Sequence, residues 1–172
     1  MAYRVLLSDS LGPEGLARLR EQPDLEVDAR PGLSPAELRE EPDFLEQHFG
    51  SWQGLTYDAL AALRDGAAHR FWHAPAVERP PGGESFADVV ARVASAVRRI
   101  SPAAAGRDLV VVAHGGSIRA ALAHALGLEA ERALGFAIDN CSLTRLDHFA
   151  ADDAWRVGAV NLTARSPGSL AG

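Results

Sequence analysis

The chain has 172 residues, of which 47% are hydrophobic, and its 17 basic and 23 acidic residues give a formal net charge of -6. These values indicate one soluble globular domain, large enough to bury a hydrophobic core. Every basic residue is an arginine, which excludes a P-loop lysine and a Schiff-base lysine, and an acidic balance without a basic cluster argues against a nucleic-acid partner.

Cysteine usage and the lengths of the apolar runs bear on the compartment. Cys141 is the only cysteine, so neither an internal disulfide nor a thiolate zinc site can form, and a reducing setting fits. The N-terminal stretch lacks the features of a signal peptide, and the longest apolar runs are strand-sized. We therefore expect a cytoplasmic protein that is neither exported nor membrane-spanning.

The first forty residues predict alternating strands and helices. Tyr3–Asp9 is a β-type run, and Pro13–Arg20 has the early proline and glutamate and the late arginines of a helix. Leu25–Val27 is predicted to be a second short strand. Ser34–Glu37 forms a capping box with proline at the first helical position, which predicts a short helix after it.

The middle of the chain predicts an aromatic loop and two helices. Phe44–Gly54 is punctuated by aromatic residues and glycines without helical or alternating periodicity, so we expect an ordered loop. Thr56 can cap a helix that ends at about Gly66, and the prolines of Phe71–Pro81 predict irregular chain. Glu84–Ile100 has apolar residues on one helical face and predicts a long helix.

The last third predicts a strand, a glycine turn and a helix, followed by two more strands. Leu109–Ala113 is a continuous apolar run, typical of a strand buried on both faces of a parallel sheet. His114–Ser117 follows it directly, and Ile118–Leu126 returns to helical spacing. Ser142–Asp147 and Trp155–Val160 alternate as two strands joined by a polar turn do.

Two residues stand where chemistry could take place. His114 comes at the carboxyl end of a predicted buried strand, where α/β proteins bind ligands, and the following glycines would let an anion reach the free N–H groups of the next helix. A buried histidine bonded to a backbone carbonyl is the alternative. Glu46 lies in the aromatic loop, where burial would favour the protonated carboxyl that a general acid needs, and a solvated loop glutamate is the alternative.

Four segments occur in a fixed order: Leu45–Leu55, Pro81–Ser85, Val111–Ala120 and Asp139–Thr144. Together they resemble the histidine phosphatase (phosphoglycerate-mutase-like) superfamily over about residues 41–162. The resemblance implies an α/β fold of three layers with a mostly parallel sheet. It also implies phosphomonoester hydrolysis or phosphomutase chemistry on a small phosphorylated molecule, or binding of inorganic phosphate, without a metal or another cofactor, because the family uses histidine in place of metal.

The same resemblance implies roles for three residues. His114 corresponds to the histidine that donates to the oxygens of the transferring phosphoryl group, and the Gly115 amide adds a further donor. Glu46 corresponds to the residue that carries a proton to the leaving oxygen. The family acts on sugar phosphates, phosphoglycerates, nucleotide precursors and phosphoproteins, and the sequence does not select among these substrates.

One part of the family pattern is missing. Members begin with a strand that ends in Arg-His-Gly, whose histidine becomes phosphorylated, and a second phosphate-binding arginine follows some tens of residues later. This chain has no Arg-His-Gly, and its first histidine is His48. We therefore expect impaired catalysis, with a phosphate-binding pseudoenzyme and a nonfunctional chimera as the alternatives.

A different resemblance occupies the missing portion. Tyr3–Leu16 and Asp24–Leu38 resemble the N-terminal segment of D-3-phosphoglycerate dehydrogenases, but no Gly-x-Gly-x-x-Gly turn follows. We infer a chimera joined near Arg39–Pro42, with a dehydrogenase-like segment at 1–40, a truncated phosphatase-like domain at 41–165 and a flexible tail at 166–172.

The N-terminal strand could replace the missing first strand of the phosphatase sheet. We expect Arg4–Leu7 to pair beside Leu109–Ala113, which would bring Asp9 to the position of the nucleophile loop. Asp9 is a weak substitute, because aspartyl-phosphate sites rely on magnesium and on further carboxylates. A sheet edge left unpaired would favour self-association into a homo-oligomer.

The remaining candidates have ordinary structural explanations. His69 and His73 have a metal-ligand spacing only if helical, so a role in packing or in a substrate lid is preferred. Arg119 could brace the site by pairing with a carboxylate, and a solvated or structural role is the alternative. His124 and His148 are interpreted as ordinary surface or core histidines. The predicted packing residues are the small, buried Cys141 and the ring anchors Trp52, Trp72 and Trp155.

Overall fold

The computed structural model describes residues 3–7, 17, 20, 21, 23, 25–29, 40–64, 69–104 and 106–163. The chain divides into two compact units, Met1–Glu40 and Glu41–Gly172. Several predicted features lie wholly or mostly outside the described residues: the helix after Pro13, the capping box at Ser34–Glu37, Asp9 and the tail from Ser166.

The first unit contains one pair of parallel strands. Strand β1 (Tyr3–Leu7) pairs with β2 (Leu25–Ala29), with Val5 opposite Val27. Both strands were expected from the sequence, and β2 extends two residues past its predicted end. A parallel pair needs a crossover connection, so its chain direction agrees with the predicted strand–helix–strand order.

The second unit begins with short elements around the aromatic loop. Two 3₁₀ turns, η1 (Pro42–Phe44) and η2 (Gly50–Trp52), flank the extended residues that carry Glu46. Helix α2 (Tyr57–Leu63) follows, and the Thr56 hydroxyl accepts a hydrogen bond from the Ala59 amide at 3.2 Å, as predicted for its cap.

Helix α3 (Phe86–Ile100) agrees with the prediction from periodicity. It starts at a capping box in which Ser85 and Asp88 satisfy one another's backbone N–H groups. Its buried face consists of Phe86, Val89, Val93, Ala94 and Ala96. The 3₁₀ turn η3 (Pro102–Ala104) follows the helix.

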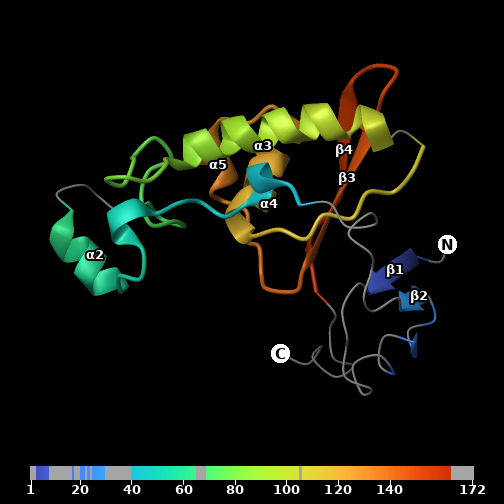
Figure 1. Ribbon diagram of the computed structural model, residues 1–172, viewed down its shortest axis with the longest axis horizontal. Coiled ribbons are helices and arrows are strands. Elements are labelled where there is room, and N and C mark those ends of the chain that lie inside the picture. The colour runs from blue at the N-terminus through green and yellow to red at the C-terminus, as the bar shows by residue number, and fades with distance from the viewer. Residues whose placement is uncertain are drawn as a thin grey trace. The chain divides into compact units, whose positions relative to one another are not determined.

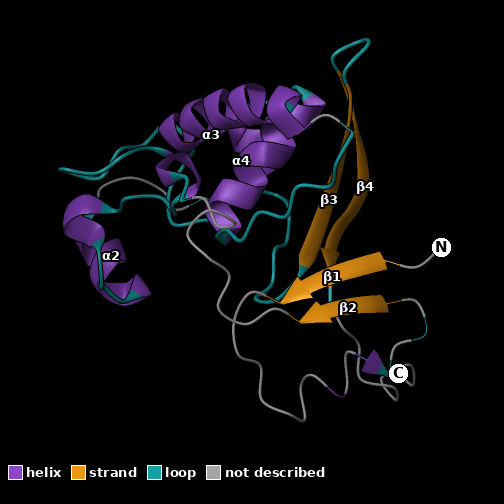
Figure 2. Ribbon diagram, turned by 45° about the vertical axis from the view of Figure 1, so that its right-hand side comes forward, coloured by secondary structure: helices purple, strands orange, loops and turns teal. Residues whose placement is uncertain are grey.

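Helix α4 (Gly115–Leu126) packs alongside α3 and starts three residues earlier than predicted. It ends at Gly127, whose left-handed backbone (φ 61°) suits glycine, and the short helix α5 (Ala130–Ala133) comes next. Figures 1 and 2 show α3 and α4 side by side. The core joins these helices, and full burial of one of its larger side chains stabilises the fold by roughly 1.5–3 kcal/mol; its members are Ala76, Phe86, Val89, Val93, Ala120, Ala123, Ala133 and Leu134.

A β-hairpin closes the described part of the second unit. Strands β3 (Leu143–Phe149) and β4 (Ala154–Leu162) pair antiparallel, with His148 opposite Trp155. Both strands and the polar turn between them were predicted. Asp147 on β3 accepts hydrogen bonds from Arg145 at 2.7 Å and from Arg156 at 2.8 Å, which places an ion-pair cluster on the hairpin.

The predicted central strand is absent, and this is a correction. Residues 109–113 are described but have no strand structure. Within the described residues, β1 pairs with β2, and the other ladder joins β3 to β4. The pairing of Arg4–Leu7 beside Leu109–Ala113 would join the two units and stays a prediction. A strand of a parallel sheet requires hydrogen-bonding neighbours, and within the described residues this segment has none.

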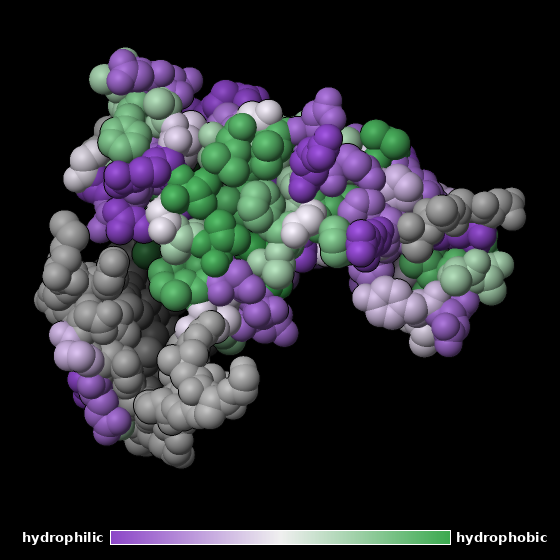
Figure 3. Space-filling model, turned by 180° about the vertical axis from the view of Figure 1, so that it is seen from behind, coloured by the Kyte–Doolittle hydropathy of each residue, from purple (hydrophilic) through white to green (hydrophobic). Residues whose placement is uncertain are grey.

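The loss of the strand leaves apolar side chains in solvent. The exposed fractions of Leu109, Val110, Val111 and Val112 are 52%, 67%, 44% and 93%. Figure 3 shows a face on which hydrophobic residues form a continuous area.

Among the described residues, no helix is long and apolar enough to cross a membrane.

Candidate active site

Glu46 lies at the N-terminal end of α4, next in space to the start of the His114 segment. Its Oε2 accepts a hydrogen bond from the Gly116 amide at 3.1 Å, and its Oε1 accepts one from the Gln47 amide at 2.8 Å. A helix N-terminus attracts negative charge through its free N–H groups. The structure therefore brings the two sequence-predicted site residues to the same end of one helix, although 68 positions separate them in the sequence.

Gly116 makes this approach possible because it has no side chain. A Cβ atom at residue 116 would lie 2.0 Å from Glu46 Oε1, far inside contact distance. At Gly115 the nearest atom to such a Cβ would be the Arg119 Nη1 at 3.1 Å, the end of a flexible side chain. The close approach of the Glu46 carboxylate is thus the reason for glycine at 116.

His114 is the N-cap residue of α4. Its backbone N–H donates to the Ser117 hydroxyl at 3.1 Å, and that hydroxyl donates to the His114 carbonyl at 3.1 Å. His114 is an exposed residue. The ring is therefore open to a ligand that approaches the helix end.

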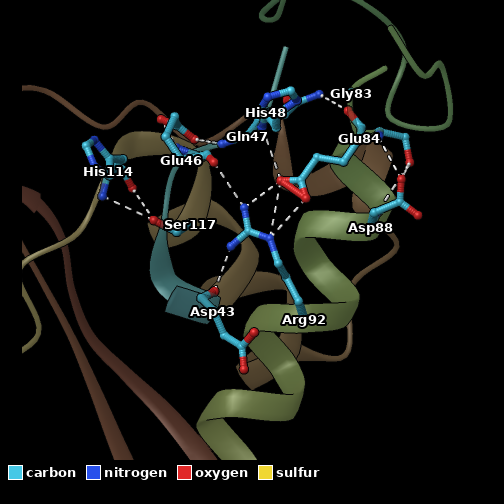
Figure 4. Close-up of polar contacts among 12 residues, drawn as sticks. Asp43, Glu46, Gln47, His48, Gly83, Glu84, Asp88, Arg92, His114 and Ser117 are labelled. Carbon is cyan, nitrogen blue, oxygen red and sulfur yellow. Dashed lines mark hydrogen bonds and ion pairs between the residues drawn. The ribbon is translucent and has the colours of Figure 1, made fainter. Parts of the chain in front are cut away.

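Arg92 holds the backbone of the Glu46 loop, and this role was not predicted from the sequence. Its guanidinium donates to the Asp43 carbonyl at 2.7 Å and to the Glu46 carbonyl at 3.1 Å, and it pairs with the Glu84 carboxylate at 2.6 Å (Figure 4). Arg92 lies mid-helix among apolar positions of α3, which was the available signal. Its five N–H donors let one side chain bind three residues at once.

Gln47 and Trp72 fix the next position of the loop. The Gln47 side chain is buried, its Nε2 donates to the Glu84 carbonyl at 2.9 Å, and its Oε1 accepts from Trp72 Nε1 at 3.0 Å. A buried amide that satisfies both of its ends is strongly oriented. Trp72 is therefore a packing anchor, as expected, that also orients the Glu46 loop.

His73 and Arg119 lie around Glu46 without hydrogen bonding to it. The ring centroid of His73 is 4.9 Å from Phe49, 5.4 Å from Tyr57 and 5.2 Å from Trp72. Burial lowers the pKa of the His73 imidazole, and the negative charge of Glu46 opposes this shift.

Arg119 has a similar electrostatic setting but different contacts. Its Nε donates to the Phe136 carbonyl at 2.7 Å, and its guanidinium lies 4.7 Å from the centroid of the Trp72 ring. Burial lowers the pKa of Arg119, and Glu46 raises it. The predicted pairing with a carboxylate is not found among the described residues, because the partners of Arg119 are the Phe136 carbonyl and the Trp72 ring, and the Glu46 carboxylate acts on it only at longer range.

Two other predictions concern His69 and Cys141. His69 Nε2 lies 3.3 Å from Glu131 Oε1, while His73 is surrounded by rings, and the segment between them is bent rather than helical. The metal-ligand spacing is therefore not realised, and no group of three metal-binding side chains is found in the described ranges. Cys141 was expected to be buried and is exposed, at a turn residue with φ 59°.

Comparison with known proteins gives the family. Residues 27–163 match the histidine phosphatase superfamily (branch 1), which is well over half of the chain. The chain belongs to the histidine phosphatase superfamily. The match begins upstream of the junction predicted near Arg39–Pro42, so the likeness to this superfamily reaches further toward the N-terminus than expected.

Two curated relatives are each similar to 70% of this chain. A bifunctional protein of Mycobacterium tuberculosis is 40% identical over 121 residues, which are 70% of this chain and 33% of that protein. The glucosyl-3-phosphoglycerate phosphatase of the same species is 37% identical over 136 residues, covering 70% of this chain and 60% of the phosphatase. The chain thus spans between a third and about 60% of these curated relatives.

A solved structure shows that the likeness extends to the fold. The mycobacterial glucosyl-3-phosphoglycerate phosphatase in complex with VO3 is 33% identical, with a TM-score of 0.63 over 77% of this chain and 65% of that chain. The histidine-phosphatase-like α/β fold predicted from the sequence is therefore confirmed. The described residues of this chain contain a parallel strand pair and a separate antiparallel hairpin.

Proposed function

We propose that this chain binds the phosphoryl group of a small phosphorylated molecule at the N-terminal end of α4, as a phosphomonoester hydrolase or phosphomutase of impaired activity. The observation that carries the proposal is the Glu46 carboxylate bonded to the Gly116 amide, on the first turn after His114. A proton carrier, an open imidazole and a helix end that favours anions then lie together.

Each residue has one role in this proposal. His114 donates to phosphoryl oxygens, and the Gly115 amide, the first N–H of α4, adds a second donor. Glu46 passes a proton to the leaving oxygen. The transferring phosphoryl group carries negative charge spread over its three equatorial oxygens, so fixed donors stabilise the transition state without a metal or another cofactor.

The substrate we favour is a phosphorylated glycerate or sugar ester. The support is the likeness to a glucosyl-3-phosphoglycerate phosphatase among the relatives, together with the VO3 bound in that enzyme's structure. Vanadate resembles phosphate in charge and oxygen geometry. A reducing, cytoplasmic setting belongs to the same proposal, on the strength of a single cysteine.

Impairment follows from the missing nucleophile. No Arg-His-Gly occurs in the sequence. Loss of a covalent nucleophile in a well-studied hydrolase costs on the order of 10⁶-fold in rate. We attribute the gap to a chimera, with a dehydrogenase-like segment at 1–40 and a truncated phosphatase-like domain at 41–165. A pseudoenzyme that binds phosphate without turnover and a nonfunctional chimera are the two alternatives.

Aryl phosphate hydrolysis between pH 5 and 8, with and without a chelator, tests turnover. The chain is compared with His114→Ala and Glu46→Gln, and with His148→Ala as a histidine control on the hairpin. We expect slow hydrolysis that survives the chelator and the control substitution and is lost in the other two variants. Equal rates in all four proteins would contradict the assigned residues.

Binding of inorganic phosphate, followed by NMR of the backbone amides, separates the alternatives. Shifts at Gly115 that are saturable and absent in His114→Ala, without any hydrolysis, would favour the pseudoenzyme. A folded chain with neither shifts nor hydrolysis would be the nonfunctional chimera, and the proposed function would then fail.

A further inference from the structure

A second group of polar side chains surrounds a pocket at the other end of α4. The pocket has a volume of about 230 Å³ and lies between α3, α4 and the β3–β4 hairpin; its lining residues are Arg98, Ser101, Pro102, His124, His148, Asp153 and Trp155. His124 lies in the last turn of α4, ten residues after His114. At 1.5 Å per residue, the two histidines are about 15 Å apart along the helix axis, so this pocket is separate from the candidate active site.

His124, one of the lining residues, has an unsatisfied polar atom. Its Nε2 is buried and has no hydrogen-bond partner within the described part of the chain. Buried polar groups are nearly always paired, with protein or with another molecule. Arg98, the fixed positive charge of the lining, also forms no hydrogen bond or ion pair with the described residues.

Aromatic rings also line the pocket, and the Asp153 carboxylate among its lining residues is already paired. The His148 ring stacks on Trp155 with centroids 4.4 Å apart, and the His124 ring meets the same indole edge-on at 5.8 Å. His148 Nε2 lies 2.9 Å from Asp153 Oδ1, so the Asp153 carboxylate has a partner. These rings offer the pocket an aromatic surface.

The balance of charge selects the kind of ligand. One guanidinium and one free imidazole nitrogen can hold a single carboxylate, while the Asp153 carboxylate at the rim would repel a second negative charge. The indole of Trp155 and the ring of Pro102 suit an apolar, planar body. We propose that this pocket binds a small monocarboxylate with a flat apolar body, its carboxylate between Arg98 and His124 and its body against Trp155.

The ligand should bring a proton with it. Burial lowers the pKa of His124, the charges of Arg98 and His148 lower it further, and Asp153 opposes them. A carboxylate bound beside the ring would favour the protonated form, so the bound state would hold more protons than the free state. Binding should therefore strengthen as the pH falls from 8 to 6.

Calorimetric titration of the full chain with benzoate, using benzamide as its uncharged match, tests the carboxylate. We expect saturable benzoate binding and binding of benzamide that is weaker by about tenfold or more. In long-range ¹H–¹⁵N NMR spectra, the signals of the His124 ring should shift with benzoate and not with benzamide. Equal binding of the two compounds, or no saturable binding, would overturn the proposal.

Neighbouring arginines provide a matched pair of variants. Arg98→Gln should weaken benzoate binding by about tenfold, whereas Arg99→Gln should change it by less than about twofold. Arg99 already pairs with Glu41 and Asp43 at 2.9 and 3.0 Å, on a different part of the surface. Equal losses in the two variants would contradict the role of Arg98, and competition by inorganic phosphate at the same concentration as benzoate would contradict selection for a monocarboxylate.

Discussion

The residue that most directly places the candidate general acid is a glycine. Gly116 is the second residue of α4, and inside a helix alanine is normally better than glycine by up to about 1 kcal/mol. The close approach of Glu46 therefore requires the residue that is less favourable for the helix, because any side chain at 116 would occupy the same space as the carboxylate.

Gly116→Ala should separate these two effects. The substitution is expected to expel the Glu46 carboxylate from the helix end while the melting temperature stays the same or rises. Hydrogen exchange at the amide of residue 116 should then accelerate, because its acceptor is gone. Gly115→Ala serves as the comparison, since its Cβ would meet the flexible Arg119 end at 3.1 Å and Ile138 at an ordinary 4.0 Å, and it should leave that exchange rate unchanged. Slow exchange in Gly116→Ala would mean that the carboxylate does not need the glycine.

His73 makes the stability of the fold depend on pH. Burial keeps the pKa of its imidazole below the ordinary value of 6.5, so the unfolded chain takes up a proton at a higher pH than the folded chain. This contribution to stability is complete above pH 6.5 and is lost progressively as the pH falls. His73→Gln should therefore flatten the dependence of the unfolding free energy on pH between 7 and 5, measured by urea denaturation, whereas an unchanged slope would exclude His73 as its source. His124 shifts in the same direction, so part of the slope should remain.

At the scale of elements, Arg92 joins α3 to the η1 turn and to the Glu46 loop. Its side chain and its partner Glu84 are each about one-fifth exposed, and its other bonds go to main-chain carbonyls. Such a largely buried pair costs more to break than a surface pair does.

Arg92→Ala should lower the unfolding free energy by about 2–3 kcal/mol, measured by denaturant titration. Arg79→Ala is the control, because Arg79 pairs with Asp88 on the same helix but is more than half exposed, and it should cost less than about 1 kcal/mol. Similar losses in both variants would show that the Arg92 bonds to the Glu46 loop add little.

Elements that carry their own signals could be predicted from the sequence. The capping box and apolar face of α3, the Thr56 cap of α2 and the alternation of β3 and β4 are all local. The run at 109–113 also has a strong strand signal, but a strand needs partners that the sequence pattern cannot supply. The contacts of Glu46 with Gly116 and with Arg92 join residues 70 and 46 positions apart, so only the family resemblance brought Glu46 and His114 together beforehand.

For the whole molecule, the exposed apolar segment at 109–112 has the largest consequence. Four consecutive large apolar side chains in solvent are a ready surface for another copy of the chain.

We expect concentration-dependent self-association, measured by sedimentation velocity. The double substitution Val110→Glu with Val112→Glu should shift the distribution toward the monomer, since both side chains are mostly exposed and their replacement removes no core contact. Val77→Glu is the control, because Val77 is 79% exposed and lies outside this segment. A monomer at every concentration, or equal effects of the two changes, would contradict this expectation.

The hydrogen bond from the Gly116 amide to Glu46 also means that the carboxylate and a bound phosphate would compete at this helix end. An incoming phosphate would bind the Gly115 N–H, next to the Gly116 N–H that the carboxylate already uses, and the two negative charges repel one another. The Glu46 carboxylate therefore competes with phosphate for this helix end. A variant with a neutral side chain at 46 should bind phosphate more tightly and hydrolyse substrate more slowly. Binding and turnover would then respond in opposite directions to a single substitution, as they do when a residue serves the reaction at the expense of the bound ground state.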